Sequence, residues 1–161
     1  MNLPNILLWG FVATIVMSTI TEGSRGIGWS RMSLPFMLGT MFTPNYDRAA
    51  VIGFLVHLVN GWVIALLYGL AFESVHRATW WLGAGIGFIQ GAAFLVLLMP
   101  LLPSLHPRMA SERTGPDPTR ALEPPGFLAL NYGNRTPLFT MLGHIAYGMI
   151  LGGFYRLASG G

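Results

Sequence analysis

Two histidines are the residues of this sequence whose type and spacing most clearly suggest chemistry. His57 and His144 lie 87 residues apart, each inside a long apolar segment. Their surroundings repeat at the same spacing, and the other identical pairs are Arg48 and Arg135, Leu55 and Leu142, Gly61 and Gly148, Tyr68 and Tyr155, Leu70 and Leu157, and Ala71 and Ala158. A histidine in such a segment is costly to bury and is by default a functional-site hypothesis. The repeat therefore predicts a paired site built from two related halves.

Three kinds of chemistry are open to this pair. Two imidazoles on facing helices could be the axial ligands of haem b, with Gly61 and Gly148 one turn away leaving room for the macrocycle. His57 and His144 could instead be two ligands of a zinc or copper ion, although zinc sites use three or four protein ligands. Proton or solute transport would use the histidines and their polar neighbours as a relay, because histidine titrates near neutral pH.

The other polar side chains that we expect to line this site lie in the same apolar segments. Asn60 is one turn after His57, and Gln90 lies near the middle of the third segment. Tyr68 and Tyr155 each follow a histidine by 11 residues, which at about 100° per residue returns to within about 20° of the same helix face. In a further alternative there is no ligand, and these side chains hydrogen-bond across helices and hold a bundle together.

The segments that must position these residues read as membrane helices. The chain has 161 residues, of which 53% are hydrophobic and 9% are charged, too little charge for a soluble globular domain of this size. Apolar runs occupy residues 3–20, 49–72, 80–102 and 137–158, each close to the roughly 20 residues that a helix needs to cross the hydrocarbon. We therefore expect a single all-α integral membrane domain over residues 1–161, with four transmembrane helices.

The connections between these runs are unequal. Residues 73–79 form a short turn, whereas residues 21–48 and 103–136 form long loops with apolar stretches. Both long loops then lie on one face and the two histidine helices run parallel, so that residues 3–72 and 80–158 are two parallel helix-loop-helix repeats. The apolar loop stretches are too short to span a bilayer. We expect them to lie at the membrane interface as a two-part lid over the histidine end of the bundle.

Helical geometry places the two histidines at one depth. His57 lies eight residues after the start of its run and His144 seven, which at about 1.5 Å per residue is roughly 10–12 Å below the long-loop face. Arg48 and Arg135 fall outside this site and are expected to be interfacial anchors. Small residues spaced by four, such as Gly83 and Gly87, predict seams along which helices approach closely.

Composition also excludes several classes of function. The chain has no cysteine and no lysine, so disulfides and thiolate ligands are ruled out. Its net charge of +3 comes from dispersed arginines without a basic run between aromatic residues, and nucleic acid is not an expected partner. Common enzyme fingerprints, including the phosphate-binding loop, the dinucleotide motif and the zinc protease motif, are missing. The sequence thus leans toward a role without catalysis.

The segment GHIAYGMILG at residues 143–152 resembles the last helix of a group of small bacterial four-helix membrane proteins of unknown function. Their second helix carries a histidine and a tyrosine as His57 and Tyr68 do, and a Met-Pro pair such as Met99 and Pro100 closes their third. The resemblance implies a four-helix fold in the bacterial inner membrane with cytoplasmic termini, and it implies no activity. The positive-inside rule favours the opposite orientation, since seven of the nine arginines lie on the long-loop face.

From these features we expect a non-enzymatic accessory or scaffold subunit of a larger membrane complex, with an intramembrane histidine pair. Its partners would be membrane lipid and either other protein chains or further copies of itself. Two alternatives stay open, a bis-histidine haem b electron-transfer protein and a component of proton or solute transport. The sequence alone does not choose among them.

Overall fold

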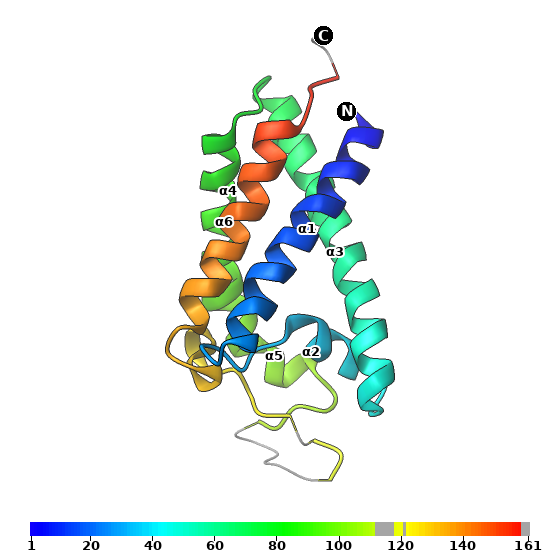
Figure 1. Ribbon diagram of the computed structural model, residues 1–161, viewed down its shortest axis with the longest axis vertical. Helices are drawn as coiled ribbons and strands as arrows, with labels where there is room; N and C mark the ends of the chain where they lie inside the picture. The colour runs from blue at the N-terminus through cyan, green and yellow to red at the C-terminus, as the bar shows by residue number, and fades with distance from the viewer. Residues whose placement is uncertain (112–117, 121, 159–161) are drawn as a thin grey trace.

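A computed structural model of the chain is helical, with four helices long and apolar enough to cross a membrane (Figure 1). It describes residues 1–111, 118–120 and 122–158, so that part of the second long loop lies outside the described residues. The spans are α1 (Leu3–Gly26), α3 (Tyr46–Ser74), a composite helix over Trp80–Leu105, and α6 (Thr136–Phe154). The prediction of an all-α protein with four membrane-compatible helices is thereby confirmed.

Local signals set where the spanning helices begin. The side chains of Asn2, Asn45 and Thr79 each accept a hydrogen bond from the backbone N–H three residues later, and so cap α1, α3 and the composite helix. Pro4 and Pro137 stand in the first turns of α1 and α6, where the N–H that proline lacks would have no helical partner. Polar and proline residues at the edges of the apolar runs thus fix the starts.

The helix ends differ from the predicted ones. α1 continues past residue 20 to Gly26, and the hydroxyls of Thr21 and Ser24 in this extension donate to carbonyl groups of the helix itself. α6 stops at Phe154, four residues before its predicted end, and Tyr155 already has an extended backbone with φ −65° and ψ 131°. Tyr68 lies within α3, whereas its repeat partner Tyr155 lies beyond the end of α6.

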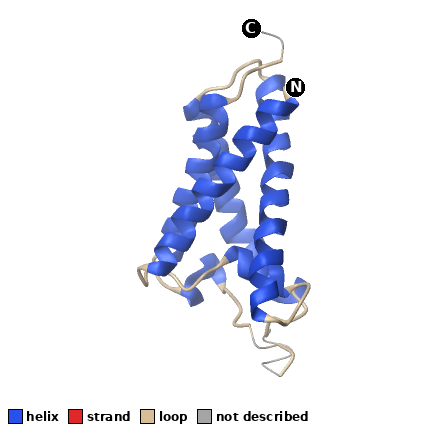
Figure 2. Ribbon diagram, turned by 45° about the vertical axis from the view of Figure 1, so that its right-hand side comes forward, coloured by secondary structure: helices blue, strands red, loops and turns tan. Residues whose placement is uncertain are grey.

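The two ends of the bundle differ. Figure 1 shows α1 leading away from the end where both termini lie, while α6 leads back to it. The described parts of the long connections lie at the other end, with the short helices α2 (Leu34–Thr40), α5 (Met99–Leu105) and η2 (Phe127–Tyr132). Seen from a second direction, the short turn after α3 is at the same end as the termini (Figure 2).

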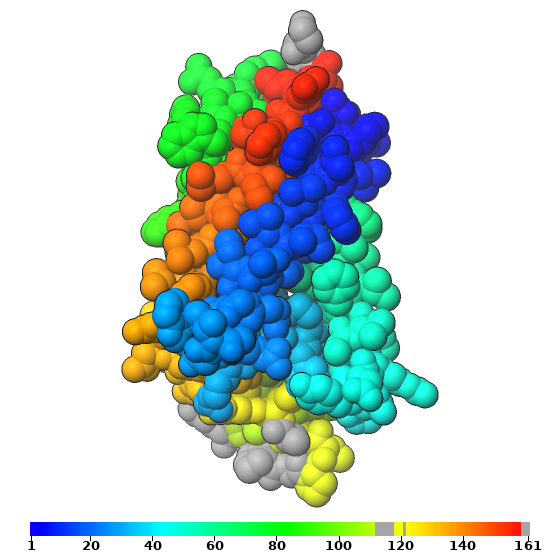
Figure 3. Space-filling view, in the orientation of Figure 1, coloured from blue at the N-terminus to red at the C-terminus, as the bar shows by residue number. Residues whose placement is uncertain are grey.

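The spans do not all pack on one another. α6 packs extensively against both α4 (Trp80–Ala93) and α1, and α1 also packs against α3. Figure 3 shows α1 in blue lying between α6 and α3. Among the described residues α3 and α4 form no comparably extensive contact. The order around the bundle is therefore α3, α1, α6, α4, with an interruption between α3 and α4.

Glycine allows α4 and α6 to touch through their backbones. A Cβ on Gly83 would overlap the carbonyl oxygen of Gly148 and lie 2.8 Å from its carbonyl carbon. A Cβ on Gly152 would likewise lie 3.0 Å from the Cα of Gly83, and one on Gly87 would lie 3.0 Å from the carbonyl carbon of His144. These residues form the α4–α6 glycine seam, as their spacing by four predicts.

Glycines also allow α2 and α3 to touch through their backbones. A Cβ on Gly53 of α3 would overlap the carbonyl oxygen of Pro35 and lie 2.6 Å from its carbonyl carbon. From the other side, a Cβ on Gly39 of α2 would lie 2.6 Å from the carbonyl carbon of Ala49. The two helices are thus in direct backbone contact over the first turns of α3, at its loop end.

The composite third span contains a π-helical segment, η1 (Phe94–Leu98), between α4 and α5. The backbone N–H of Met99 donates to the carbonyl of Phe94, five residues earlier, which is the hydrogen-bond spacing of a π-helix. Pro100 follows at once and has no N–H to donate to the preceding turn, which favours a widened turn at this place. The segment faces the cavity described below.

Both loops fold against the bundle and against each other. A buried cluster joins loop residues to the end of the third span, and its buried members are Met32, Met37, Leu95, Met99, Leu102, Met109, Ala129 and Tyr132. His106 makes a 2.9 Å hydrogen bond from Nε2 to the carbonyl of Met37, and Arg108 donates to the carbonyls of Thr40 and Met41 at 2.6 and 3.1 Å. The second loop is therefore tied to the end of α2.

Candidate functional site

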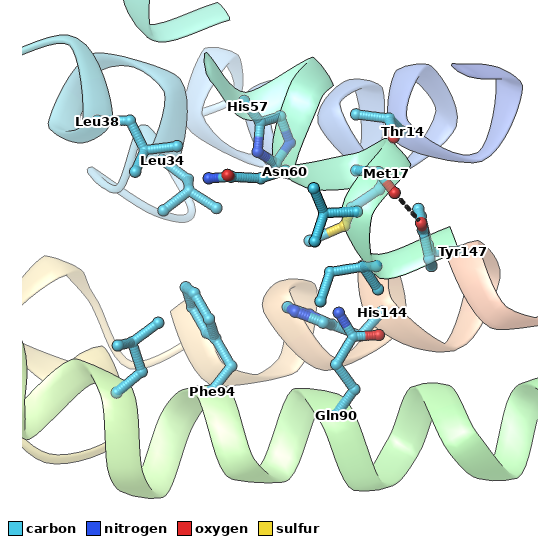
Figure 4. A pocket seen from close by; sticks show the side chains of 14 residues that line it. Thr14, Met17, Leu34, Leu38, His57, Asn60, Gln90, Phe94, His144 and Tyr147 are labelled. Carbon is cyan, nitrogen blue, oxygen red and sulfur yellow. Dashed lines mark hydrogen bonds between the residues drawn. The ribbon is translucent and has the colours of Figure 1, made fainter. Parts of the chain in front are cut away.

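The two histidines face one cavity. His57 on α3 is 7% exposed and His144 on α6 is 2% exposed, and both line a cavity of about 250 Å³ (Figure 4). Its walls come from α3 and from the third span, with α1 and α6 behind and α2 at the loop end. The structure thus brings together side chains that lie 87 residues apart in sequence.

The cavity reaches the outer surface of the bundle between α3 and α4. Three of its lining residues, Asn60, Val63 and Leu98, are exposed, and they belong to the two walls that do not pack against each other. In a protein that spans a membrane, this surface lies at the depth of the hydrocarbon. The cavity therefore opens on the side of the bundle, between α3 and the third span.

The hydrogen bonds of His144 fix where its proton lies. Its Nδ1 is 2.8 Å from the carbonyl oxygen of Thr140 in the preceding turn, and a carbonyl can only accept. In the neutral ring Nδ1 carries the proton and Nε2 is an acceptor. Phe94 packs against the ring with centroids 5.1 Å apart. For His57, no hydrogen bond to either ring nitrogen occurs within the described ranges.

Tyr68 and Gln90 connect the two walls of the cavity. The hydroxyl of Tyr68 donates to Oε1 of Gln90 at 2.7 Å, from α3 to α4. Gln90 lines the cavity, whereas Tyr68, which was predicted to line it, is not among its lining residues and is linked to it through Gln90. Asn60 also lines the cavity, and its amide forms no hydrogen bond with other described residues. The structure places Asn60 and Gln90 in the lining of the same cavity as the two histidines.

Tyr147 is a cavity residue that the sequence analysis missed. Its side chain is 2% exposed, lines the cavity, and donates from its hydroxyl to the carbonyl of Gly61 at 2.6 Å. The repeat contained a signal for it, because Tyr147 follows His144 by three residues as Asn60 follows His57. The two equivalent positions hold different residues, Asn60 and Tyr147, so identity between the two repeats does not mark them.

Tyr155, predicted to line the site, lies elsewhere. It follows the end of α6, and its hydroxyl donates to Oε1 of Glu73 at 2.7 Å and accepts from the backbone N–H of Asn2 at 3.0 Å. These contacts place it at the end of the bundle that carries the termini, away from the cavity. The early end of α6 removes Tyr155 from the helix face that it was predicted to share with His144.

The glycines next to the histidines face neighbouring helices. A Cβ on Gly61 would overlap the side-chain oxygen of Thr14 on α1, and one on Gly148 would overlap the backbone of Gly83 on α4. The room beside both glycines is thus filled by protein and is not left for a macrocycle. The space that the two glycines were expected to leave for a haem between His57 and His144 is therefore occupied by α1 and α4.

A metal ion would need more ligands than the histidine pair supplies. Within the described ranges no group of three or more histidine, aspartate or glutamate side chains is placed to hold a metal ion. Two imidazoles fall short of the three protein ligands of a catalytic zinc site. No aspartate, glutamate or arginine is among the residues that line the cavity. Its polar groups are amides, hydroxyls and imidazoles.

Comparison of the chain with protein-family models, with curated proteins and with solved structures finds no match.

Proposed function

We propose that this chain is a non-enzymatic accessory subunit of a larger assembly in the bacterial inner membrane, and that it holds an uncharged, lipid-soluble molecule in the cavity between α3 and α4. The observation that carries the proposal is a sideways-opening cavity that contains polar groups without partners. Unsatisfied polar groups in a membrane cost several kcal/mol each, so a molecule that bonds to them would stabilise the folded protein.

The chemistry of the lining supports an uncharged molecule. His57, Asn60, Gln90 and His144 are polar residues that line the cavity, and no side chain with a fixed charge is among its lining residues. A charged group taken from water into such surroundings would lose its hydration without gaining a counter-ion. A neutral polar group on an apolar body avoids this cost.

The two halves of the chain give a second line of support. If they are a duplicated unit, as the sequence repeat suggests, the pairing of α3 with α4 is the counterpart of the pairing of α6 with α1. α6 packs closely on α1, whereas α3 and α4 do not pack comparably among the described residues. The cavity occupies the place of that second interface, which supports a ligand as its occupant.

Two valines of α3 provide a matched test. Val59 and Val63 are 53% and 51% exposed and lie one turn apart, but only Val63 lines the cavity. The protein would be extracted with its native lipids into polymer-bounded discs, and co-purified small molecules would be measured by mass spectrometry. We expect one molecule to be retained in stoichiometric amount by the wild type and by Val59→Trp, and to be lost from Val63→Trp. Equal retention by both variants, or no enriched molecule in the wild type, would contradict the proposal.

The accessory role is tested separately, by cross-linking in intact membranes followed by mild extraction. A partner chain should appear in fixed stoichiometry, and a tag on that partner should recover this protein in return. A monodisperse monomer without reciprocal recovery would refute the accessory role and leave the ligand proposal standing.

A further inference from the structure

We infer that the molecule held in the cavity carries a hydroxyl group, and that this hydroxyl donates to His144 Nε2 and accepts from the side-chain amide of Gln90. The ligand class is then an alcohol or phenol on a hydrocarbon body. This inference rests on the proposed function and adds the chemical identity of the bound group.

His144 contributes an acceptor that is fixed by its own helix. Because Nδ1 donates its proton to the carbonyl of Thr140 at 2.8 Å, the remaining ring nitrogen offers a lone pair. Nε2 has no hydrogen-bond partner among the described residues, although His144 is only 2% exposed. The group that binds it must donate a hydrogen bond.

Gln90 contributes a donor that is fixed by Tyr68. Its Oε1 is used by the Tyr68 hydroxyl at 2.7 Å, which leaves the two N–H groups of the amide on the other side of the side chain. Both Gln90 and His144 line the cavity. Gly91, the residue after Gln90, packs against His144, because a Cβ on Gly91 would lie 3.1 Å from the Cβ of His144.

A hydroxyl is the smallest neutral group that satisfies both side chains, since it has one donor and two acceptor lone pairs. An ether, ester or ketone oxygen accepts from Gln90 but leaves Nε2 of His144 without a donor. A carboxylate has the same defect and brings a charge into a lining without a counter-ion. The pair thus selects for O–H over the other common oxygen groups of lipids.

Apolar residues show where the hydrocarbon body would lie. Leu34 and Leu38 of α2 line the cavity, as do Phe94 and Leu98 of η1. In Figure 4 Leu34, Leu38 and Phe94 lie on one side of His144, and Tyr147 lies on the other. The hydroxyl would sit at Gln90 and His144, with the chain directed toward the loop end.

The experiment compares three photoreactive probes on the purified full-length protein in lipid nanodiscs. The probes share one diazirine-bearing alkyl chain and differ only in the end group, which is an alcohol, its methyl ether or a carboxylic acid. Labelled residues are identified by peptide mass spectrometry. We expect the alcohol to label cavity residues about tenfold more than the ether, the factor that corresponds to about 1.4 kcal/mol for one unmade hydrogen bond.

The variant His144→Phe removes the Nε2 acceptor that only the alcohol can use, and we expect the preference of the alcohol over the ether to fall to about one. The wild-type comparison does not depend on whether this variant folds. Equal labelling of the cavity by alcohol and ether, or stronger labelling by the acid, would overturn the hydroxyl inference while the ligand site stands. If no probe labels the cavity above the level found in Val63→Trp, the proposed function itself fails.

Discussion

Replacing Gly83 by alanine should separate α4 from α6 and destabilise the protein. An alanine Cβ at this position would overlap the carbonyl oxygen of Gly148, and it would lie 2.8 Å from the carbonyl carbon of Gly148 and 3.0 Å from the Cα of Gly152. All three atoms belong to the backbone of α6. No side-chain rotation can relieve the overlap, so the helices themselves must move.

The size of the effect follows from these distances. Carbon atoms pack best at about 3.5–4.0 Å, so the helices must part by at least about 0.7 Å at this level, and gaps of 0.5–1 Å forfeit about a quarter to a half of each dispersion contact. Overpacking of this kind costs about 1–3 kcal/mol. The overlap is with rigid backbone and reaches the neighbouring glycines of the α4–α6 seam. We therefore expect a loss of about 2–3 kcal/mol.

Gly85 provides the control, because it lies on the same helix and a Cβ there would meet nothing within 4 Å. Gly85→Ala should be neutral or should stabilise by about 0.5–1 kcal/mol through the lower flexibility of the unfolded chain. The free energy of unfolding of both variants would be measured by steric trapping in bicelles. If Gly83→Ala proves as stable as Gly85→Ala, the backbone contact between α4 and α6 does not exist in the protein.

Three further predictions concern polar side chains. Tyr147→Phe removes the bond to the carbonyl of Gly61 and should lower the unfolding free energy by about 0.6–1 kcal/mol; an unchanged value in the same trapping assay would contradict this. Burial lowers the pKa of His106 below its usual value of 6.5, so its contribution to stability should be complete above pH 6.5 and decrease as the pH falls toward the lowered value. Thermal unfolding in nanodiscs should show this decrease in the wild type and a smaller one in His106→Asn, and equal decreases would refute the assignment. Tyr155→Phe breaks the bond to Glu73 and should speed amide hydrogen exchange in residues 155–158, whereas unaltered exchange there would show that the bond does not hold this segment.

The parts of the fold that depend on local sequence were predictable. Each apolar run is long enough to span a bilayer on its own, and capping residues such as Asn45 and Thr79 mark the starts. The end of α6 was not predictable, because the apolar pattern continues past Phe154. Tyr155 instead bonds to Glu73 and Asn2, which are distant in sequence. Contacts of this kind cannot be read from periodicity.

The candidate site was predictable only as far as the two halves behave alike. His57 and His144 face one cavity, as their repeated surroundings suggested. Gly61 and Gly148 occupy equivalent positions but meet different neighbours, a threonine side chain in one half and a glycine backbone in the other. Each glycine faces the first helix of its own half, α1 or α4, and the difference lies in the residue that stands there, Thr14 or Gly83. Neighbour relations between helices, and hence the position of the cavity, are tertiary information that a repeat does not contain.

The close approach of α2 to α3 has a consequence for motion. Because Gly53 and Gly39 hold these helices in backbone contact, we expect them to move as one body and α4 and α6 to move as a second. Spin labels placed on the two bodies would report any relative displacement. A change in the width of the opening would then leave Leu34 and Leu38 beside His57, since these residues belong to α2 and α3. A ligand that enters there would meet an unchanged α2 wall.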